Sequence, residues 1–104
     1  MNNYCMIEVA FDNMIEVNKI IDVLLSKKLV ASIHIIESKS SWNWKGKREN
    51  SKEYLLQMIT KINKQSDIYN EIKKIHGYEC FEFAIFEINT ISNDYIKWID
   101  EEVN

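Results

Sequence analysis

The stretch that decides the fold is residues 31–62, ASIHIIESKSSWNWKGKRENSKEYLLQMITKI. Apolar side chains occupy both faces of its part from Tyr54 to Ile59, as in a strand that is buried in a sheet. The pair Lys45-Gly46 near the middle can supply a tight turn. The segment therefore predicts a β-hairpin whose two arms each hold about 14 residues and extend about 45 Å. Because a chain of this length has a radius of gyration of about 13 Å, such arms would reach beyond their own core.

The segments on both sides of this hairpin alternate between strand and helix patterns. An almost continuously apolar run at Tyr4–Phe11 predicts a central strand, and apolar residues at helical spacing follow it. After the hairpin, Ser66 and Asp67 can cap a second helix, which Gly77 ends. The predicted elements are, in chain order, a strand at Tyr4–Phe11, a helix with apolar positions from Val17 to Leu25, extended arms at Ala31–Trp44 and Lys47–Ile62, a helix with apolar positions from Ile68 to Ile75, a strand at Cys80–Ile88 and a helix at Asp94–Glu102.

This order of elements, β-α-β-β-α-β with a further C-terminal helix, predicts the α+β class. It is the order of the ferredoxin-like split βαβ sandwich. In that arrangement both crossover helices pack on one face of an antiparallel sheet. The 104 residues suffice for one domain, residues 1–104, and are too few for two cores.

The outer part of the hairpin carries large aromatic side chains that a monomer would leave in water. Trp42, Trp44 and Tyr54 lie there, on an edge that invites pairing with another chain. A closed ring of identical copies removes such edges, so the sequence predicts a homo-oligomer. The alternative is a hairpin that bends and covers its own aromatic residues.

Composition excludes two classes of partner. The net charge is −3 and Arg48 is the only arginine, so the basic surface that nucleic acids require is missing. No apolar run approaches the roughly 20 residues of a membrane span. The first residues, Met1–Tyr4, lack the basic start and apolar core of a signal peptide. The sequence therefore predicts a cytoplasmic protein that binds neither nucleic acid nor membrane.

Six short stretches, spread in order over nearly the whole chain, resemble the CutA or divalent-cation tolerance family. Residues 44–47, WKGK, match that family's W-(E/K)-G-K hairpin tip, and residues 76–82, HGYECFE, resemble its H-P-Y-E-x-P-E. The other four stretches are Val9–Asp12, Lys27–Ser32, Glu53–Leu56 and Asp94–Ile99. The resemblance implies a homotrimer of ferredoxin-like subunits whose long hairpins clasp their neighbours. It also implies a role in tolerance to divalent metal ions, with copper binding attributed to the family.

Several positions depart from the family pattern. Ser32 stands where many members have cysteine, and Ile59 occupies the place of a lysine. Gly77 and Phe81 replace the two prolines of the H-P-Y-E-x-P-E motif. A ligand site that is built on that cysteine or that lysine therefore does not carry over unchanged.

A metal site is predicted at His76, Glu79 and Glu82. This grouping can supply one imidazole and one or two carboxylates, to be completed by another subunit, and copper favours nitrogen donors. The resemblance links the histidine that matches His76 to metal. The alternative is that His76 caps the carbonyl groups of its helix while Glu79 is a solvated or interface charge. His34, in an apolar stretch, is predicted to be a core or interface residue.

An intersubunit cleft is predicted mainly from aromatic residues, which could line a pocket for a small ligand or could be buried there for packing alone. The predicted cleft residues are Trp42, Trp44, Lys47, Tyr54, Tyr78 and Trp98. Cys5 and Cys80 are predicted to be packing residues, because the sequence lacks the four closely spaced ligands of a structural zinc site.

Three functions remain open, and none of them is enzymatic. The chain has two glycines, too few for a loop that cradles phosphate, and it has no Ser-His-Asp signature. No organic cofactor is expected. The first function is a trimer that binds copper or another divalent cation in metal tolerance. The second is a signalling or adaptor trimer that holds a small ligand in its intersubunit clefts, and the third is a rigid platform for a protein partner.

Overall fold

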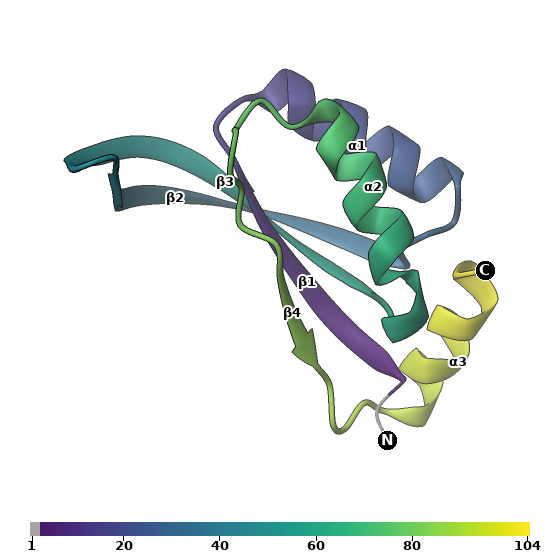
Figure 1. Cartoon of the computed structure of the whole chain (residues 1–104). Coiled ribbons are helices and arrows are strands. Elements are labelled where there is room, and N and C mark those ends of the chain that lie inside the picture. Colours follow the sequence, from purple (N-terminus) through teal and green to yellow (C-terminus); the bar gives the residue numbers. More distant parts are fainter. Residues whose placement is uncertain (1–2) are drawn as a thin grey trace.

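The structure, a computed structural model, describes residues 3–104 (Figure 1). Its strands and helices follow the predicted order, which confirms the α+β class. The elements are β1 (Tyr4–Phe11), α1 (Met14–Ser26), β2 (Ser32–Trp44), β3 (Lys47–Lys61), a 3-10 turn (Ile62–Lys64), α2 (Gln65–Ile75), β4 (Ala84–Glu87) and α3 (Asn93–Glu102). Within this part of the chain, no helix has both the length and the apolar character that crossing a bilayer requires.

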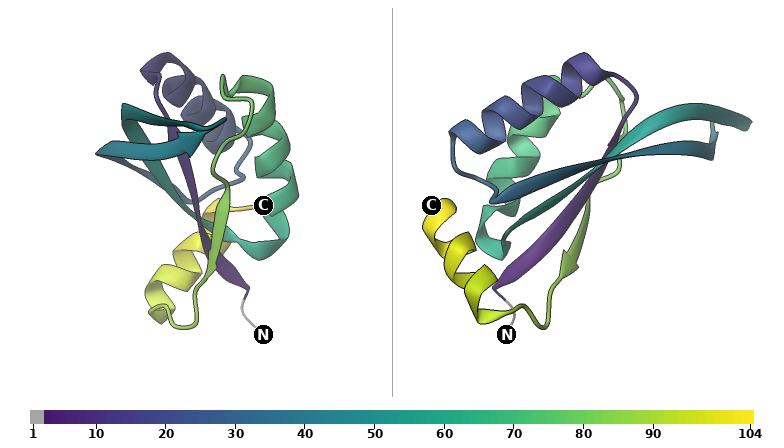
Figure 2. Two further views of the ribbon diagram at one scale, coloured as in Figure 1. Left: turned by 60° about the vertical axis from the view of Figure 1, so that its left-hand side comes forward. Right: turned by 180° about the vertical axis from the view of Figure 1, so that it is seen from behind.

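The four strands form one sheet in the order β2-β3-β1-β4, and every neighbouring pair is antiparallel. Helices α1 and α2 lie on the same side of this sheet (Figures 1 and 2). Alternate residues of β1 face these helices and are fully buried, namely Cys5, Ile7, Val9 and Phe11. The core therefore lies between the helices and one face of the sheet, as the split βαβ arrangement requires.

The hairpin of β2 and β3 is as long as the sequence predicts. The strands pair without interruption from Ser32 opposite Ile59 to Trp44 opposite Lys47. Lys45 and Gly46 both have positive φ angles, 49° and 80°, which is the geometry of a type I′ turn. The outer end of the hairpin projects from the body of the protein (Figure 2), whose principal extents are 45 × 26 × 22 Å.

The second face of the sheet is only partly covered. At one end, α3 packs Ile99 and Val103 against Tyr4 and Ile59 of this face. Elsewhere large apolar side chains remain in water, with Ile36 42% exposed and the β4 residue Phe86 49% exposed. This open face is the main apolar surface of the sheet that the chain leaves uncovered.

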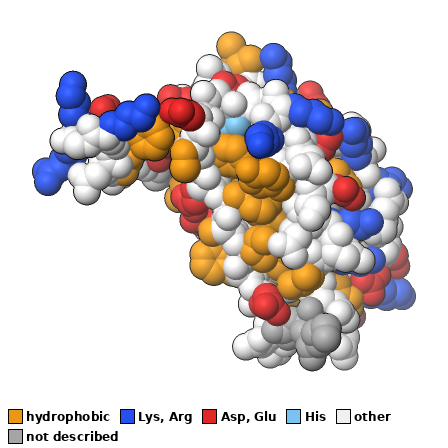
Figure 3. All heavy atoms as spheres, viewed as in Figure 1, with side chains coloured by type: hydrophobic (Ala, Val, Ile, Leu, Met, Phe, Trp, Pro, Cys, Tyr) orange, Lys and Arg blue, Asp and Glu red, His pale blue; other side chains and the backbone are white. Residues whose placement is uncertain are grey.

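Strand β4 is shorter than predicted, because residues 80–83 at its start and Ile88 at its end lie outside it. The last β1 residue that pairs with β4 is Glu8, and the carbonyl oxygen of Ala10 accepts a hydrogen bond from the His76 ring instead. In the segment that replaces the start of the strand, Phe81 and Phe83 pack on Tyr69 of α2, with ring centres 5.5 Å and 5.1 Å apart. Figure 3 shows hydrophobic side chains gathered over this segment.

The two cysteines have different surroundings. Cys5 is buried in β1, as predicted, and burial raises the pKa of its thiol to about 11. Cys80 is exposed, so its prediction as a packing residue is wrong. The reason is the shortened β4, which leaves Cys80 on the surface segment between α2 and that strand.

Candidate functional site

His76 follows the last turn of α2 and is held inside an aromatic stack. Its ring lies nearly parallel to the rings of Phe11 and Phe81, with centres 4.2 Å and 4.7 Å away. Nδ1 accepts a hydrogen bond from the Tyr78 backbone N–H at 3.1 Å, so the ring hydrogen is on Nε2, which donates to the Ala10 carbonyl oxygen at 2.7 Å. Both ring nitrogens are therefore engaged within the subunit. Neither caps the helix carbonyl groups, and neither is free for a metal ion.

The other two predicted metal ligands point to different partners. Glu79 is exposed and forms an ion pair with Lys45 at 3.7 Å. Glu82 hydrogen-bonds to Glu8 of β1. In residues 3–104 of one subunit, no three His, Cys, Asp or Glu side chains lie close enough together to hold a metal ion. The structure thus does not assemble His76, Glu79 and Glu82 into one site, because the segment that carries them bends at Glu79 and Cys80 and each side chain finds a different partner.

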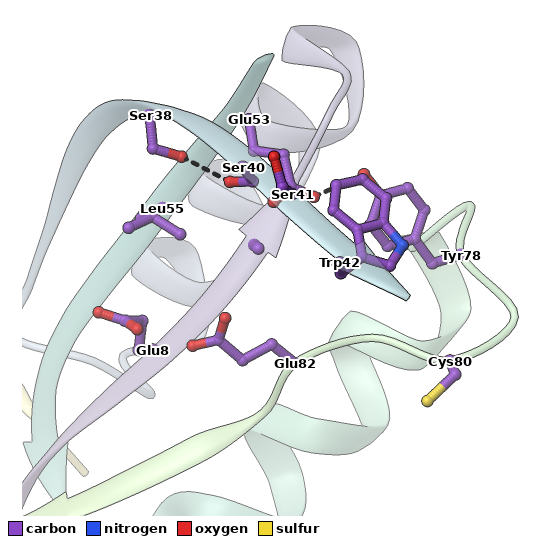
Figure 4. A pocket seen from close by; sticks show the side chains of 11 residues that line it. Glu8, Ser38, Ser40, Ser41, Trp42, Glu53, Leu55, Tyr78, Cys80 and Glu82 are labelled. Carbon is purple, nitrogen blue, oxygen red and sulfur yellow. Dashed lines mark hydrogen bonds between the residues drawn. The ribbon is translucent and has the colours of Figure 1, made fainter. Parts of the chain in front are cut away.

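Glu82 instead faces a pocket of about 430 Å³ between the hairpin and the segment that precedes β4 (Figure 4). Every strand except β4 contributes to its walls. The lining residues are Glu8, Ala10, Ser38, Ser40, Ser41, Trp42, Glu53, Leu55, Tyr78, Cys80 and Glu82. Three of these are carboxylates and none is basic, so the pocket has a negative potential that favours cations.

The Glu8–Glu82 pair is the electrostatic centre of this pocket. Desolvation, followed by the hydrogen bond to Glu8 and by repulsion from Glu8 and Glu53, raises the pKa of Glu82 to about 7. The hydrogen bond from Glu82 lowers the pKa of Glu8, as does a second one from the Gln57 amide at 3.0 Å. Glu82 is therefore the proton donor of the pair, and close to neutral pH the two carboxyl groups share a proton.

Glu53 forms the buried wall of the same pocket. It is 6% exposed and accepts a hydrogen bond from the Tyr78 hydroxyl at 2.7 Å. Burial, followed by this bond to Glu53, raises the pKa of Tyr78 well above its usual range. Opposite Glu53 on β2 is Ser38, whose hydroxyl lies 3.1 Å from that of Ser40. The pocket thus combines carboxylate and hydroxyl oxygens.

A second pocket of about 360 Å³ adjoins the first towards the tip of the hairpin. Its lining residues are Trp42, Trp44, Glu49, Tyr78, Glu79 and Cys80. Three of them, Trp42, Tyr78 and Cys80, also line the first pocket, so the two cavities are neighbours. The rings of Trp42 and Tyr78 are 6.5 Å apart at an angle of 42°.

The structure brings together three of the six predicted cleft residues, namely Trp42, Trp44 and Tyr78. Tyr54 packs against the core on the helix side, because it alternates with Glu53 and Leu55, which face the first pocket. The remaining two, Lys47 and Trp98, line neither pocket, and Trp98 packs on Tyr95 of α3. His34 is exposed, so it does not have the core role that was one of its two predicted roles, and its interface role stays a prediction.

Sequence reasoning missed Glu8 and Glu53 as pocket residues. The one signal for Glu8 was a single charged residue inside the apolar strand Tyr4–Phe11, which requires a partner when it is buried. Glu53 gave no such signal, because it lies in a polar stretch of the hairpin, where charged residues are usually solvated.

Comparison with known proteins gives a consistent result. The model of a family described as CutA1 divalent ion tolerance protein matches residues 5–102. The divalent-cation tolerance protein CutA of Archaeoglobus fulgidus is 30% identical over 103 residues, which cover 99% of each chain. The protein of that name from Thermotoga maritima is 30% identical over 80 residues, 77% of this chain and 79% of the relative.

Solved structures agree with the sequence comparison. A structure of the periplasmic divalent cation tolerance protein CutA from Archaeoglobus fulgidus has a TM-score of 0.93 at 29% identity and covers 97% of this chain and 99% of that one. The crystal structure of CutA1 from Oryza sativa has a TM-score of 0.92, with coverage of 99% and 95%. At 21% identity, the second likeness supports the fold alone.

Proposed function

Because this chain belongs to the CutA1 divalent ion tolerance family, we propose that it is a non-enzymatic, cytoplasmic homotrimer that binds copper or another divalent cation. The observation that carries the cation proposal is the hydrogen-bonded pair of Glu8 and Glu82 inside an acidic pocket. A divalent cation would replace the proton that the pair shares and would offset the charge of both carboxylates.

The oxygen donors of this pocket suit a divalent cation. Carboxylates and hydroxyl groups are typical ligands of Mg²⁺, Ca²⁺ and Mn²⁺, and among first-row metals a given site usually binds Cu²⁺ most tightly. Ser38 and Ser40 could add hydroxyl oxygens to the carboxylates of Glu8 and Glu82. We assign the cation to these residues rather than to His76, whose ring would first have to leave its hydrogen bonds and its stack.

The trimer proposal is supported by the surfaces that one subunit leaves uncovered. Ile36 and Phe86 lie on the open face of the sheet, and the hairpin projects beyond the core. Three copies around an axis would bury these apolar side chains, at a gain of about 25 cal/mol for each Å² removed from water. Closed cyclic symmetry would also leave no hairpin edge free for further association.

The cation proposal is tested by calorimetric titration of the assembled protein with Mn²⁺ and with Cu²⁺ at pH 7. Each titration is run in two buffers of different ionisation enthalpy, so that released protons are counted. The expected result is saturable binding with proton release, which Glu82→Gln weakens at least tenfold. Glu79→Gln serves as the matched control, because Glu79 is exposed and paired with Lys45. Unchanged binding in Glu82→Gln would show that the cation binds at another site. Absence of cation binding by the wild-type protein would remove the cation function.

A second function, a signalling or adaptor trimer that binds a small ligand, is favoured by the aromatic walls of the second pocket. Cavities that bind small organic molecules combine apolar walls with a few polar groups. A ligand that binds the native state raises its melting temperature by mass action, so a screen of metabolites for such a shift tests this function.

A further inference from the structure

We propose that the second pocket, lined by Trp42, Trp44 and Tyr78, binds an organic cation that carries an alkylated ammonium group. For its biological use the inference rests on the second of the two proposed functions, and it names the chemical class of the ligand. The divalent-cation proposal involves other side chains and stands or falls separately.

The aromatic walls come from two separate parts of the fold. Trp42 and Trp44 alternate along β2 and therefore project from the same face of the hairpin. Tyr78 lies on the segment that follows α2 and faces Trp42, with ring centres 6.5 Å apart. A cavity of about 360 Å³ between three such rings is large enough for a small organic cation.

The charges at this pocket select for positive ligands. Glu49 lies opposite Trp42 in the hairpin register, and Glu79 follows Tyr78 directly, so both sides of the cavity carry a carboxylate. No lysine or arginine is among its lining residues, and the adjoining pocket adds Glu8, Glu53 and Glu82. Aromatic faces beside carboxylates attract a cation through both the ring quadrupole and the net charge.

The chain places one of its own cations in this environment. The Lys45 ammonium lies 5.3 Å from the centre of the Trp44 ring and 3.7 Å from a carboxylate oxygen of Glu79. Its side chain is 71% exposed at the tip of the hairpin, so it can move away without disturbing the core. Lys45 therefore marks a position at the rim of the pocket where an ammonium group is stable, and it would compete with a ligand for that position.

Hydration favours an alkylated cation over both Lys45 and metal ions. A primary ammonium group and a divalent metal ion are strongly hydrated, and both lose much of that hydration against an aromatic face. Methyl groups on nitrogen spread the charge and weaken hydration, which is why aromatic cages bind quaternary ammonium groups. Trp42, Trp44 and Tyr78 supply such faces, whereas the carboxylates of the first pocket suit a compact divalent ion.

The experiment uses the assembled protein and tetramethylammonium chloride as the probe. Binding is followed through the indole N–H signals of the tryptophans in nitrogen-15-labelled protein. We expect saturable shifts of the Trp42 and Trp44 signals and none of Trp98, which lies on α3. The uncharged molecule tert-butanol, of similar size, should bind at least about fivefold more weakly, because it lacks the cation–π attraction. Equal binding of the two probes, or equal shifts of all three tryptophans, would overturn the proposal.

Variants give a second and more specific readout. Trp42→Leu and Trp44→Leu should weaken tetramethylammonium binding about fivefold or more, while Trp98→Leu should not. Lys45→Asn removes the competing ammonium and keeps a residue that tolerates the positive φ angle at this position, so affinity should rise about two- to fivefold. A merely structural role for Lys45 would leave the affinity unchanged or lower it, and either result contradicts the proposal.

The experiments distinguish failure of the organic-cation proposal from failure of the divalent-cation function. Copper binding that Glu82→Gln weakens, together with no tetramethylammonium binding, would remove only the present inference. Tetramethylammonium binding without copper binding would remove only the divalent-cation function.

Discussion

The carboxyl group of Glu82 donates a hydrogen bond to the carboxylate of Glu8. These residues are 74 positions apart in the chain, one before β4 and the other in the middle of β1. Their contact forms because residues 80–83 run beside β1 without joining the sheet, so that Glu82 can turn towards the pocket (Figure 4). The longer connection from α2 to β4, which includes these residues, also carries His76, Tyr78 and Phe81, and it therefore determines most of the candidate site.

Glu82 should make the stability of the protein depend on pH. Because its pKa in the folded state is about 7, above the usual 4.5, the folded protein binds more protons than the unfolded chain between these values. The free energy of unfolding therefore falls as pH rises from about 5 to 8. Glu82→Gln should lose this dependence, and solvent screening limits the difference to about 1 kcal/mol or less. Urea unfolding of the wild-type protein and of Glu82→Gln, at pH 5 and at pH 8, measures this change in the free energy of unfolding. A decline that is equally steep in Glu82→Gln would contradict the assignment.

Replacement of His76 should affect stability and leave metal affinity unchanged. His76→Ala removes the hydrogen bond to Ala10 and the stack between Phe11 and Phe81, at a cost of about 2–3 kcal/mol. Chemical denaturation measures this cost. Lys19→Ala is the control, since Lys19 is exposed on α1, away from the open face of the sheet, and its replacement should change stability by less than about 0.5 kcal/mol. Loss of copper binding by a folded His76→Ala protein would restore His76 as a ligand.

The open face of the sheet should control assembly. Phe86→Asp places a charge among the apolar side chains of this face, so we expect the trimer to dissociate into folded subunits. Sedimentation equilibrium measures the mass of the wild-type protein and of Phe86→Asp in solution. In the control, Ile15→Asp changes another large apolar residue, 67% exposed on α1, and the proposed trimer should persist. A monomeric wild-type protein at micromolar concentration would remove the trimer proposal.

The hydrogen bond that Thr60 of β3 donates to Leu29, in the segment before β2, should stabilise the protein. The Thr60 hydroxyl is fully buried and donates to the Leu29 carbonyl oxygen at 2.6 Å. Thr60→Val keeps the shape of the side chain and leaves that oxygen without this donor, so the protein should lose about 1–3 kcal/mol of stability. Thr90→Val is the control at an exposed position, and it should leave the free energy of unfolding nearly unchanged. Thermal unfolding of the two variants compares these effects directly.

The candidate site was only partly predictable from the sequence. The side chains of Trp42 and Trp44 lie on one face because they are two residues apart in a strand, and this relation is visible in the sequence. Tyr78 joins them through a tertiary contact that no local pattern encodes. The metal prediction at His76 followed from residue type and resemblance, which do not show that Ala10 and Tyr78 already engage both ring nitrogens.

By itself, the sequence determined the order of the elements, the long hairpin and its turn at Lys45-Gly46. These features depend on the spacing of apolar residues and on the conformational freedom of individual residues, which are local properties of the chain. Only the tertiary structure decided where β4 begins, which atoms engage His76, and that Glu8, Glu53 and Glu82 face one pocket. These outcomes depend on packing and hydrogen bonds between residues far apart in the sequence, and the free energy of such contacts exists only after the chain has folded around them.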